Sequence, residues 1–272
     1  MRFTVVFLFV LFAVGCSSRG DEQQRLLTVT TEPYRFVVEA VAGDAWSVNT
    51  LVPRGGDPET FDPTVREIMS LSNSRAYFMV GGLGFEDAWR ERIAEMFPAL
   101  RMVDTSVGIL RESGDPHLWC SPDNMLLIAD NVCEALCRMD SAGAEGYRAR
   151  CDSLCAEIAE THRLIEARLE AVERRTFLVF HPTLTYFARL YGLRQLAIEE
   201  EGKEPSAAHI KAVIDTARNE NVAIVFVQQE FDSKNAITIA REIGARVVRI
   251  DPLSYEWRKE LLNIADEMVK NK

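Results

Sequence analysis

The chain has 272 residues, which is enough for two modest domains or one large one. Its 47% hydrophobic and 26% charged residues are ordinary for a soluble globular protein. The formal net charge of −10 at pH 7 argues against a nucleic-acid-binding surface, which needs clustered lysine and arginine, so no nucleic-acid partner is expected.

The N-terminus has the pattern of an export signal. Arg2 is followed by about a dozen apolar residues, which is too short for a membrane span of roughly 20 residues and suits the core of a signal peptide. Cys16 then follows a small residue in the sequence AVGC, which resembles a bacterial lipoprotein signal. We predict that residues 1–25 are a lipoprotein signal and tether, with a membrane anchor on lipidated Cys16. A cleaved signal with an incidental cysteine is the alternative.

Apolar runs of strand length alternate with helical segments in both halves of the chain. The first series of predicted strands covers residues 26–30, 46–52, 76–82 and 101–103. The second series covers residues 176–180, 193–198, 222–227 and 245–250. Strands that are apolar throughout and are joined by helices indicate parallel sheets covered on both faces. We therefore predict an α/β protein with two Rossmann-like lobes.

A region without strand character lies between the two series. Residues 123–139 and 144–173 carry helical periodicity, and the second segment would be about 45 Å long as a single helix. A helix of that length suits a rigid strut between two lobes. The predicted organisation is an N-terminal α/β lobe at 26–140, a connecting helix at 141–174 and a C-terminal α/β lobe at 175–272.

Four cysteines of this helical region are symmetrically spaced. Cys133 and Cys137 are one helical turn apart, and so are Cys151 and Cys155. If the chain turns at 141–143 into an antiparallel helix, Cys137 would face Cys151 and Cys133 would face Cys155. We predict two disulfides that staple this helical hairpin, which an oxidising, exported location permits. A four-thiolate metal site and four small core residues are the alternatives.

Metal-binding types of side chain follow several of the predicted strands. These candidates are Glu59, His117, His181, Glu230 and Asp251. In open α/β sheets, ligands bind in the crevice beyond the C-terminal ends of the strands. We therefore expect side chains from both lobes to meet in the cleft.

Two of the candidates occupy loops of nearly identical sequence. GDPET at residues 56–60 presents Glu59, and GDPHL at residues 114–118 presents His117. Proline fixes the backbone just before each candidate, and the Gly-Asp turn lets the loop bend sharply. A preorganised loop loses less entropy when its side chain is captured by a metal.

The sequence resembles the zinc/manganese substrate-binding proteins of bacterial ABC transporters over nearly all of residues 26–270. The resemblance is carried by LVPRGGDPETFDPT, GGLGFEDAW, GDPHLWCSPDN, the long helix, FHPTLTYFARLYGL, EGKEPSAAHIKAVID and IDPL. It implies that two α/β lobes joined by a rigid helix capture a divalent metal and deliver it to a membrane permease. It also implies a cell-envelope location, in the periplasm or at the cell surface. Carried over by position, the metal ligands are Glu59, His117, His181 and Asp251, with Glu230 as the alternative to Asp251.

The ligand at position 59 departs from the family pattern. The family usually has histidine there, in a DPH triplet, whereas this chain has glutamate. A site of two imidazoles and two carboxylates favours manganese or iron more than a site with three imidazoles does. We still favour zinc, because zinc accepts carboxylates readily and binds more tightly than manganese.

Two rival functions follow from the same residues. A metal-dependent hydrolase would use Glu59 as a general base beside a three-ligand metal. A receptor for a metal chelate or a vitamin would need a roomy cleft without convergent ligands. Four protein ligands would close the coordination sphere, so a receptor rather than an enzyme is the prediction.

Overall fold

The computed structural model describes residues 25–199, 205–231 and 234–270. The predicted lipoprotein signal, including Cys16, lies outside these residues. Within them the chain forms two four-stranded parallel sheets. The strands of the first sheet are β1 (Leu26–Val29), β2 (Ser47–Thr50), β3 (Ala76–Met79) and β4 (Arg101–Asp104). Those of the second are β5 (Thr176–Val179), β6 (Arg194–Ala197), β7 (Ile224–Gln228) and β8 (Arg246–Ile250).

The two sheets share one topology. The first has the order β2-β1-β3-β4 and the second has the order β6-β5-β7-β8. In each sheet the second strand in the sequence lies on one side of the first strand, and the third and fourth strands lie on its other side. The central strands β3 and β7 are buried along their whole length, which explains their continuous apolar sequences. Each of the eight strands overlaps a predicted strand, and the predicted α/β class with two Rossmann-like sheets is confirmed.

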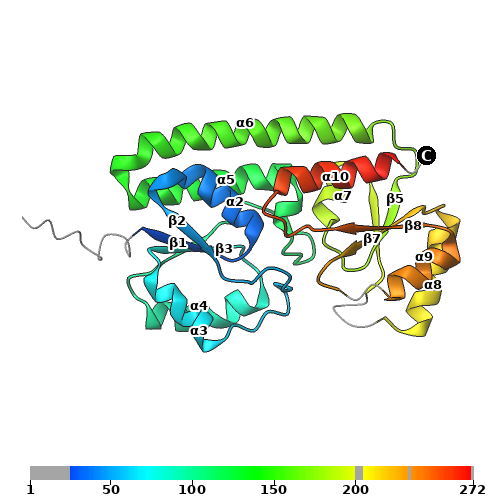
Figure 1. Ribbon diagram of the computed structural model, residues 1–272, viewed down its shortest axis with the longest axis horizontal. Helices are drawn as coiled ribbons and strands as arrows, with labels where there is room; N and C mark the ends of the chain where they lie inside the picture. Colours follow the sequence, from blue (N-terminus) through cyan, green and yellow to red (C-terminus); the bar gives the residue numbers. More distant parts are fainter. Residues whose placement is uncertain (1–24, 200–204, 232–233, 271–272) are drawn as a thin grey trace, which may run out of the picture.

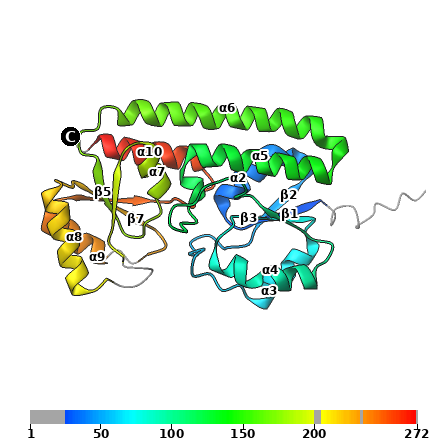
Figure 2. The same cartoon turned by 180° about the vertical axis from the view of Figure 1, so that it is seen from behind.

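Helices cover both sheets, and one of them spans the molecule. They are α2 (Glu32–Ala42), α3 (Val65–Ser70), α4 (Gly84–Met96), α5 (Pro122–Met139), α6 (Ala144–Leu169), α7 (Thr185–Leu190), α8 (Ala207–Asn219), α9 (Lys234–Ile243) and α10 (Trp257–Val269). Figure 1 shows α6 running along one side of both sheets, with α5 and α10 beneath it. The reverse view in Figure 2 shows α3 and α4 under the first sheet and α8 and α9 under the second.

The long helix α6 ties the two halves together. Its 26 residues correspond to about 39 Å. It packs against α5 and α2 from the first half and against α10 from the end of the chain. Seven of its residues, spaced mostly three or four apart, are buried toward these partners. The predicted connecting helix is therefore present.

The hairpin of α5 and α6 differs from the predicted one in its register. Cys133, Cys137, Cys151 and Cys155 are all free thiols, so the prediction of two disulfides is wrong for this structure. The thiol facing Cys151 is that of Cys133, not that of Cys137. Cys137 instead donates a hydrogen bond to the Ala144 carbonyl, with a sulfur–oxygen distance of 3.6 Å. The symmetric cysteine spacing correctly predicted that the two helices pack against each other, but the predicted cysteine contacts are shifted by one helical turn from those in the structure.

Among the described residues, none of the helices is both long enough and apolar enough to cross a membrane.

Candidate metal centre

Three of the predicted ligands meet between the two sheets. Glu59 follows β2, His117 follows β4 and His181 comes two residues after β5. One donor atom from each lies within 4.8 Å of the others. The Nε2 atom of His117 lies 3.5 Å from one carboxylate oxygen of Glu59, and that of His181 lies 3.6 Å from the other. The Glu59 carboxylate therefore lies between the two imidazoles.

Each imidazole is held by a carboxylate on its far nitrogen. The Nδ1 atom of His117 lies 2.7 Å from Asp115, and that of His181 lies 2.9 Å from Glu199. Because an ionised carboxylate only accepts hydrogen bonds, Nδ1 carries the hydrogen in both rings. For a neutral ring this leaves the Nε2 lone pair aimed at Glu59, which is the arrangement found around metal-binding histidines.

The two Gly-Asp-Pro loops have the same internal hydrogen bond. The Asp57 carboxylate accepts from the backbone N–H of Glu59 at 2.9 Å, and that of Asp115 accepts from the N–H of His117 at 2.8 Å. Both are turns in which aspartate accepts from the residue two positions later. The sequence repeat therefore corresponds to a repeated structure that fixes the backbone of each candidate ligand.

The loop that carries His181 is fixed from the neighbouring strand. Gln228, at the end of β7, is buried and donates hydrogen bonds to the His181 carbonyl at 2.5 Å and to the Thr183 hydroxyl at 2.9 Å. The Phe231 ring stacks on the His181 ring, with 4.9 Å between centroids. Rotation of the His181 ring is thus limited by contacts on its edge and its face.

Aromatic packing also encloses His117. The Trp119 ring contacts the His117 ring edge to face at 5.2 Å, and Trp119 is almost fully buried. His117, Trp119 and His181 line a cavity of about 10 Å³ together with Glu230. That volume is close to the minimum that one water molecule requires. The space between the candidate ligands suits a single small particle.

The charges of the centre favour a bound cation. Burial alone would lower the pKa of His181, but the carboxylates of Glu199 and Glu59 raise it to about 10. Burial alone would raise the pKa of Glu59, yet the His181 and His117 rings lower it overall. The buried Nε2 atom of His181 has no hydrogen-bond partner among the described residues. The Glu59 carboxylate lies 3.6 Å from this atom, so a cation between the two groups would bind both.

The separation of the donor atoms fits a metal ion. In a tetrahedral zinc site with bonds of about 2.0–2.1 Å, neighbouring donors lie roughly 3.3–3.4 Å apart. The distances of 3.5 and 3.6 Å from Glu59 to the imidazole nitrogens are within a few tenths of an ångström of that value. Two nitrogens and a carboxylate are also ligands that divalent transition metals accept.

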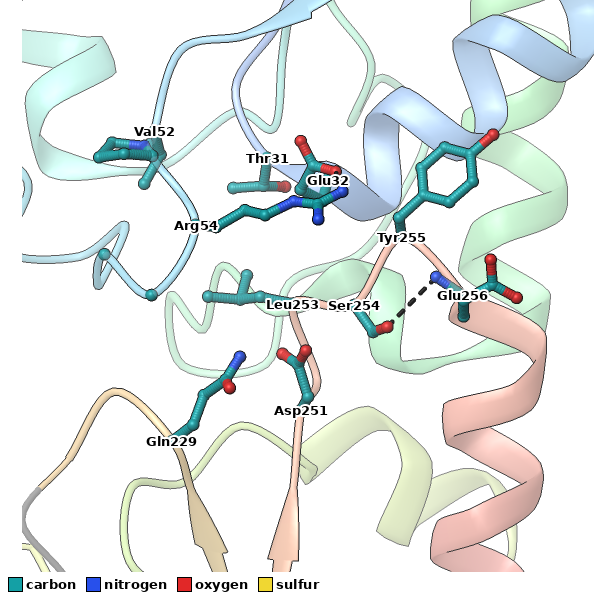
Figure 3. Close-up of a pocket in the computed structure, with 13 residues that line it drawn as sticks. Thr31, Glu32, Val52, Arg54, Gln229, Asp251, Leu253, Ser254, Tyr255 and Glu256 are labelled. Atoms are coloured by element: carbon teal, nitrogen blue, oxygen red, sulfur yellow. Dashed lines mark hydrogen bonds and ion pairs between the residues drawn. The ribbon is translucent and has the colours of Figure 1, made fainter.

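Asp251 lies outside this three-residue group. It lines a neighbouring pocket of about 260 Å³, between Arg54 and Glu32 on one side and Gln229 on the other. Figure 3 shows the Asp251 carboxylate at the end of β8, pointing into this pocket. Its Oδ1 atom is buried and has no hydrogen-bond partner among the described residues.

Glu230 borders the small cavity itself. Its Oε1 atom is also buried and without a hydrogen-bond partner in the described part of the chain. Burial raises the pKa of both Glu230 and Asp251, and each carboxylate is further influenced by nearby acidic groups. The structure thus provides two carboxylates beside the centre, and neither belongs to the group of three.

Cross-lobe hydrogen bonds hold the walls of the cleft together. The Trp119 indole donates to the Pro252 carbonyl at 2.8 Å, and the Trp257 indole donates to the Trp119 carbonyl at 2.7 Å. The Tyr186 hydroxyl donates to the Asp115 carbonyl at 2.8 Å. The loop that carries His117 is therefore fixed by contacts with residues that follow α6 in the chain.

Sequence reasoning missed the two carboxylates that orient the imidazoles. Asp115 stands two residues before His117, so the repeated Gly-Asp-Pro motif contained a local signal for it. Glu199 is 18 residues from His181 and reaches it because β6 pairs with β5. No local pattern could have identified Glu199 without the strand order.

Comparisons with known proteins identify the family and agree with the fold. The family model described as zinc-uptake complex component A, periplasmic, matches residues 27–270. The manganese-binding lipoprotein MntA of Halalkalibacterium halodurans is 26% identical over 258 residues, which cover 89% of this chain and 85% of that protein. The high-affinity zinc uptake system protein ZnuA of Bacillus subtilis is 25% identical over 294 residues, covering 97% and 92%.

A solved structure extends the match to three dimensions. The crystal structure of ZnuA aligns with a TM-score of 0.87 and 34% sequence identity, over 91% of this chain and 99% of that one. The resemblance predicted from the motifs is confirmed. Because the family match extends over almost the whole chain, the protein belongs to the family of the periplasmic component A of zinc-uptake complexes.

Proposed function

We propose that the protein is the substrate-binding component of an ABC transporter, and that it captures a divalent transition metal and delivers it to a membrane permease. One observation carries the proposal. Glu59, His117 and His181, from three separate parts of the chain, bring their donor atoms within 4.8 Å of one another. The buried Nε2 atom of His181 makes no hydrogen bond among the described residues and faces the Glu59 carboxylate at 3.6 Å, which supports a cation held between the two groups.

The size of the central cavity favours an ion over an organic ligand. About 10 Å³ leaves no room for a chelate, a vitamin or a hydrolysable substrate between the imidazoles. The larger pocket near Asp251 holds none of the three clustered residues. The small space between the imidazoles supports a receptor over a metal-dependent hydrolase that uses Glu59 as a base.

Zinc is the proposed cargo, and manganese and iron are the competing ones. Two imidazole nitrogens, each within 3.6 Å of an oxygen of the Glu59 carboxylate, support zinc. The carboxylate at position 59 makes the site less selective against manganese than three imidazoles would. Relatives named for zinc and for manganese are both among the proteins described above.

Asp251 is the proposed fourth ligand. Its buried Oδ1 atom has no hydrogen-bond partner among the described residues, and its loop follows a strand of the second sheet. Glu230 has the same property and borders the small cavity directly. Asp251→Asn and Glu230→Gln discriminate between them: if Asp251 is the ligand, only its replacement lowers metal affinity by more than about tenfold.

Isothermal titration calorimetry of the chelator-treated protein tests the function. Zinc and manganese should each bind with a stoichiometry of one at the cleft, and His117→Ala or His181→Ala should lower the affinity by orders of magnitude. His162→Ala is a matched control, because His162 stacks on Tyr191 and takes no part in the group of three. Unchanged binding in both site variants would refute the proposal.

We also propose that the protein is exported and anchored to the cell envelope by a lipid on Cys16. The support is the apolar run after Arg2 and the AVGC sequence. The relative from Halalkalibacterium halodurans is named as a lipoprotein. Metabolic labelling with a radioactive fatty acid should label the protein, and Cys16→Ala should abolish the label.

A further inference from the structure

A second group of metal-binding side chains lies on the α5–α6 hairpin. Asp130, Cys151 and Cys155 each offer a donor atom within 4.8 Å of the other two. The group shares no residue with the cleft centre. Among the described residues, these two are the only sets of three or more metal-binding side chains at such spacing.

The helical geometry explains the convergence. Cys151 and Cys155 are four residues apart on α6, so their thiols lie on one face of the helix. Asp130 lies on the facing helix α5, and the Cys151 sulfur lies 3.8 Å from its Oδ1 atom. Cys133, three residues after Asp130, places its thiol in contact with that of Cys151. The group of three thus joins one donor from α5 to two from α6, and Cys133 lies beside it in contact with Cys151, as in metal sites built between facing helices.

The group is partly open to ions from solution. Cys151 and Cys133 are buried, Cys155 is half-buried and Asp130 is exposed. A cation could thus reach the thiols from the Asp130 side without any opening of the hairpin. The donor set of thiolate sulfurs and one carboxylate differs from the nitrogen and oxygen set of the cleft. Sulfur donors select soft cations, whereas the cleft donors suit harder ones.

We infer that Asp130, Cys151 and Cys155 form a second cation site, for a thiophilic d¹⁰ divalent ion such as Zn²⁺ or Cd²⁺, with Cys133 as the fourth donor. On binding, each thiol exchanges its S–H bond for a metal–sulfur bond and releases a proton to solvent. Four protein donors would leave no open position, so the site is structural or a store and not catalytic. It would cross-link α5 and α6 through the ion.

Cadmium titration of the reduced, chelator-treated protein tests the inference, because cadmium–thiolate bonds absorb in the ultraviolet and imidazole–carboxylate sites do not. We use a His117→Ala background, in which the cleft site is disabled. This protein should still bind one Cd²⁺ with thiolate absorption. Adding Cys155→Ser should abolish the absorption. Cys137→Ser is the matched control and should leave it unchanged, because Cys137 contacts Cys133 and hydrogen-bonds to the Ala144 carbonyl but does not belong to the group of three.

A second measurement covers the case in which a serine variant fails to fold. Cd²⁺ should protect Cys155 from alkylation in the protein with both sites intact. Asp130 is exposed, so Asp130→Asn should leave the fold intact, and it should weaken that protection at least tenfold. Absence of thiolate absorption in the His117→Ala protein, or alkylation of Cys155 at the same rate with and without Cd²⁺, would overturn the inference. Failure of the cleft proposal would appear separately, as metal binding that His117→Ala and His181→Ala leave unchanged.

Discussion

The two Gly-Asp-Pro loops share one turn but present their ligands differently. In both, the aspartate carboxylate accepts the backbone N–H two residues later. Asp115 also binds the ring of His117, at 2.7 Å. Asp57 has no such contact with Glu59 and instead accepts from the Thr60 hydroxyl at 2.8 Å. Asp115 therefore accepts hydrogen bonds from both the backbone and the ring of His117, whereas Glu59 donates to Asp57 from its backbone alone.

Burial follows the same difference. The His117 side chain is 4% exposed, whereas that of Glu59 is 30% exposed. The same local sequence thus places one candidate ligand, His117, inside the protein and the other, Glu59, at its edge. A rigid imidazole pair with a movable carboxylate can accept an ion without a large rearrangement. The two histidine side chains are already ordered before the ion binds, so they lose little conformational entropy on binding.

The largest expected effect separates the two ligands directly. His117→Ala removes a buried donor that no other side chain can replace, and it should lower zinc affinity by more than about 1,000-fold. Glu59→Ala should lower it by about 10–100-fold, because other carboxylates lie beside the cavity. Calorimetry or a competing chelator measures both. Equal losses in the two variants would contradict the distinction between fixed and adjustable ligands.

The two aspartates provide the next comparison. Asparagine at either position keeps an oxygen that accepts the backbone N–H, so the turn survives. Asp115→Asn removes the charge on the His117 ring and should lower metal affinity by about 10–100-fold. Asp57→Asn should change it by less than about threefold, because Asp57 does not touch an imidazole. If the two variants lose affinity equally, the turn itself and not the ring contact fixes His117.

A substitution that makes the two loops alike should change metal selectivity. Glu59→His supplies a third imidazole, which favours zinc over manganese. The ratio of zinc to manganese affinity should rise by about tenfold or more, as measured by competition between the two ions. Glu59→Gln, which keeps the size of the side chain, is the control and should not raise the ratio. A ratio that stays constant in Glu59→His would show that position 59 does not contribute to selectivity.

The smallest expected effect is on the stability of the metal-free protein. The folded-state pKa of His181 is raised to about 10, above the value of about 6.5 expected when unfolded. The resulting stabilisation is complete at or below pH 6.5 and is lost as the pH rises through 10. Thermal melts with a chelator should therefore show a falling Tm over this range. Glu59→Gln should weaken the trend, and Asp57→Asn should not.

The strand positions and the clustering of three candidate ligands could be predicted from the sequence for a simple reason. Continuous apolar runs mark buried parallel strands, and ligands follow strand ends, so local patterns carry the information. The register of the α5–α6 hairpin could not be predicted in this way. The cysteine spacing is compatible with Cys151 facing either Cys133 or Cys137, and only the packing of the whole hairpin decides between them.

The environment of the ligands was also beyond local reasoning. Glu199 orients His181 through the pairing of β5 with β6, which the sequence did not specify. Asp251 follows a strand end as expected, yet its side chain points into the neighbouring pocket. The end of a strand can be predicted from the local sequence, whereas the direction of the side chain that follows depends on the loops around it.

Anomalous X-ray scattering from crystals grown with zinc tests the central claim most directly. Data collected above and below the zinc edge should place one ion at bonding distance from Glu59 and from the Nε2 atoms of His117 and His181. An ion found elsewhere in the cleft with these three side chains unligated, or a cleft without anomalous signal at saturating zinc, would contradict the account.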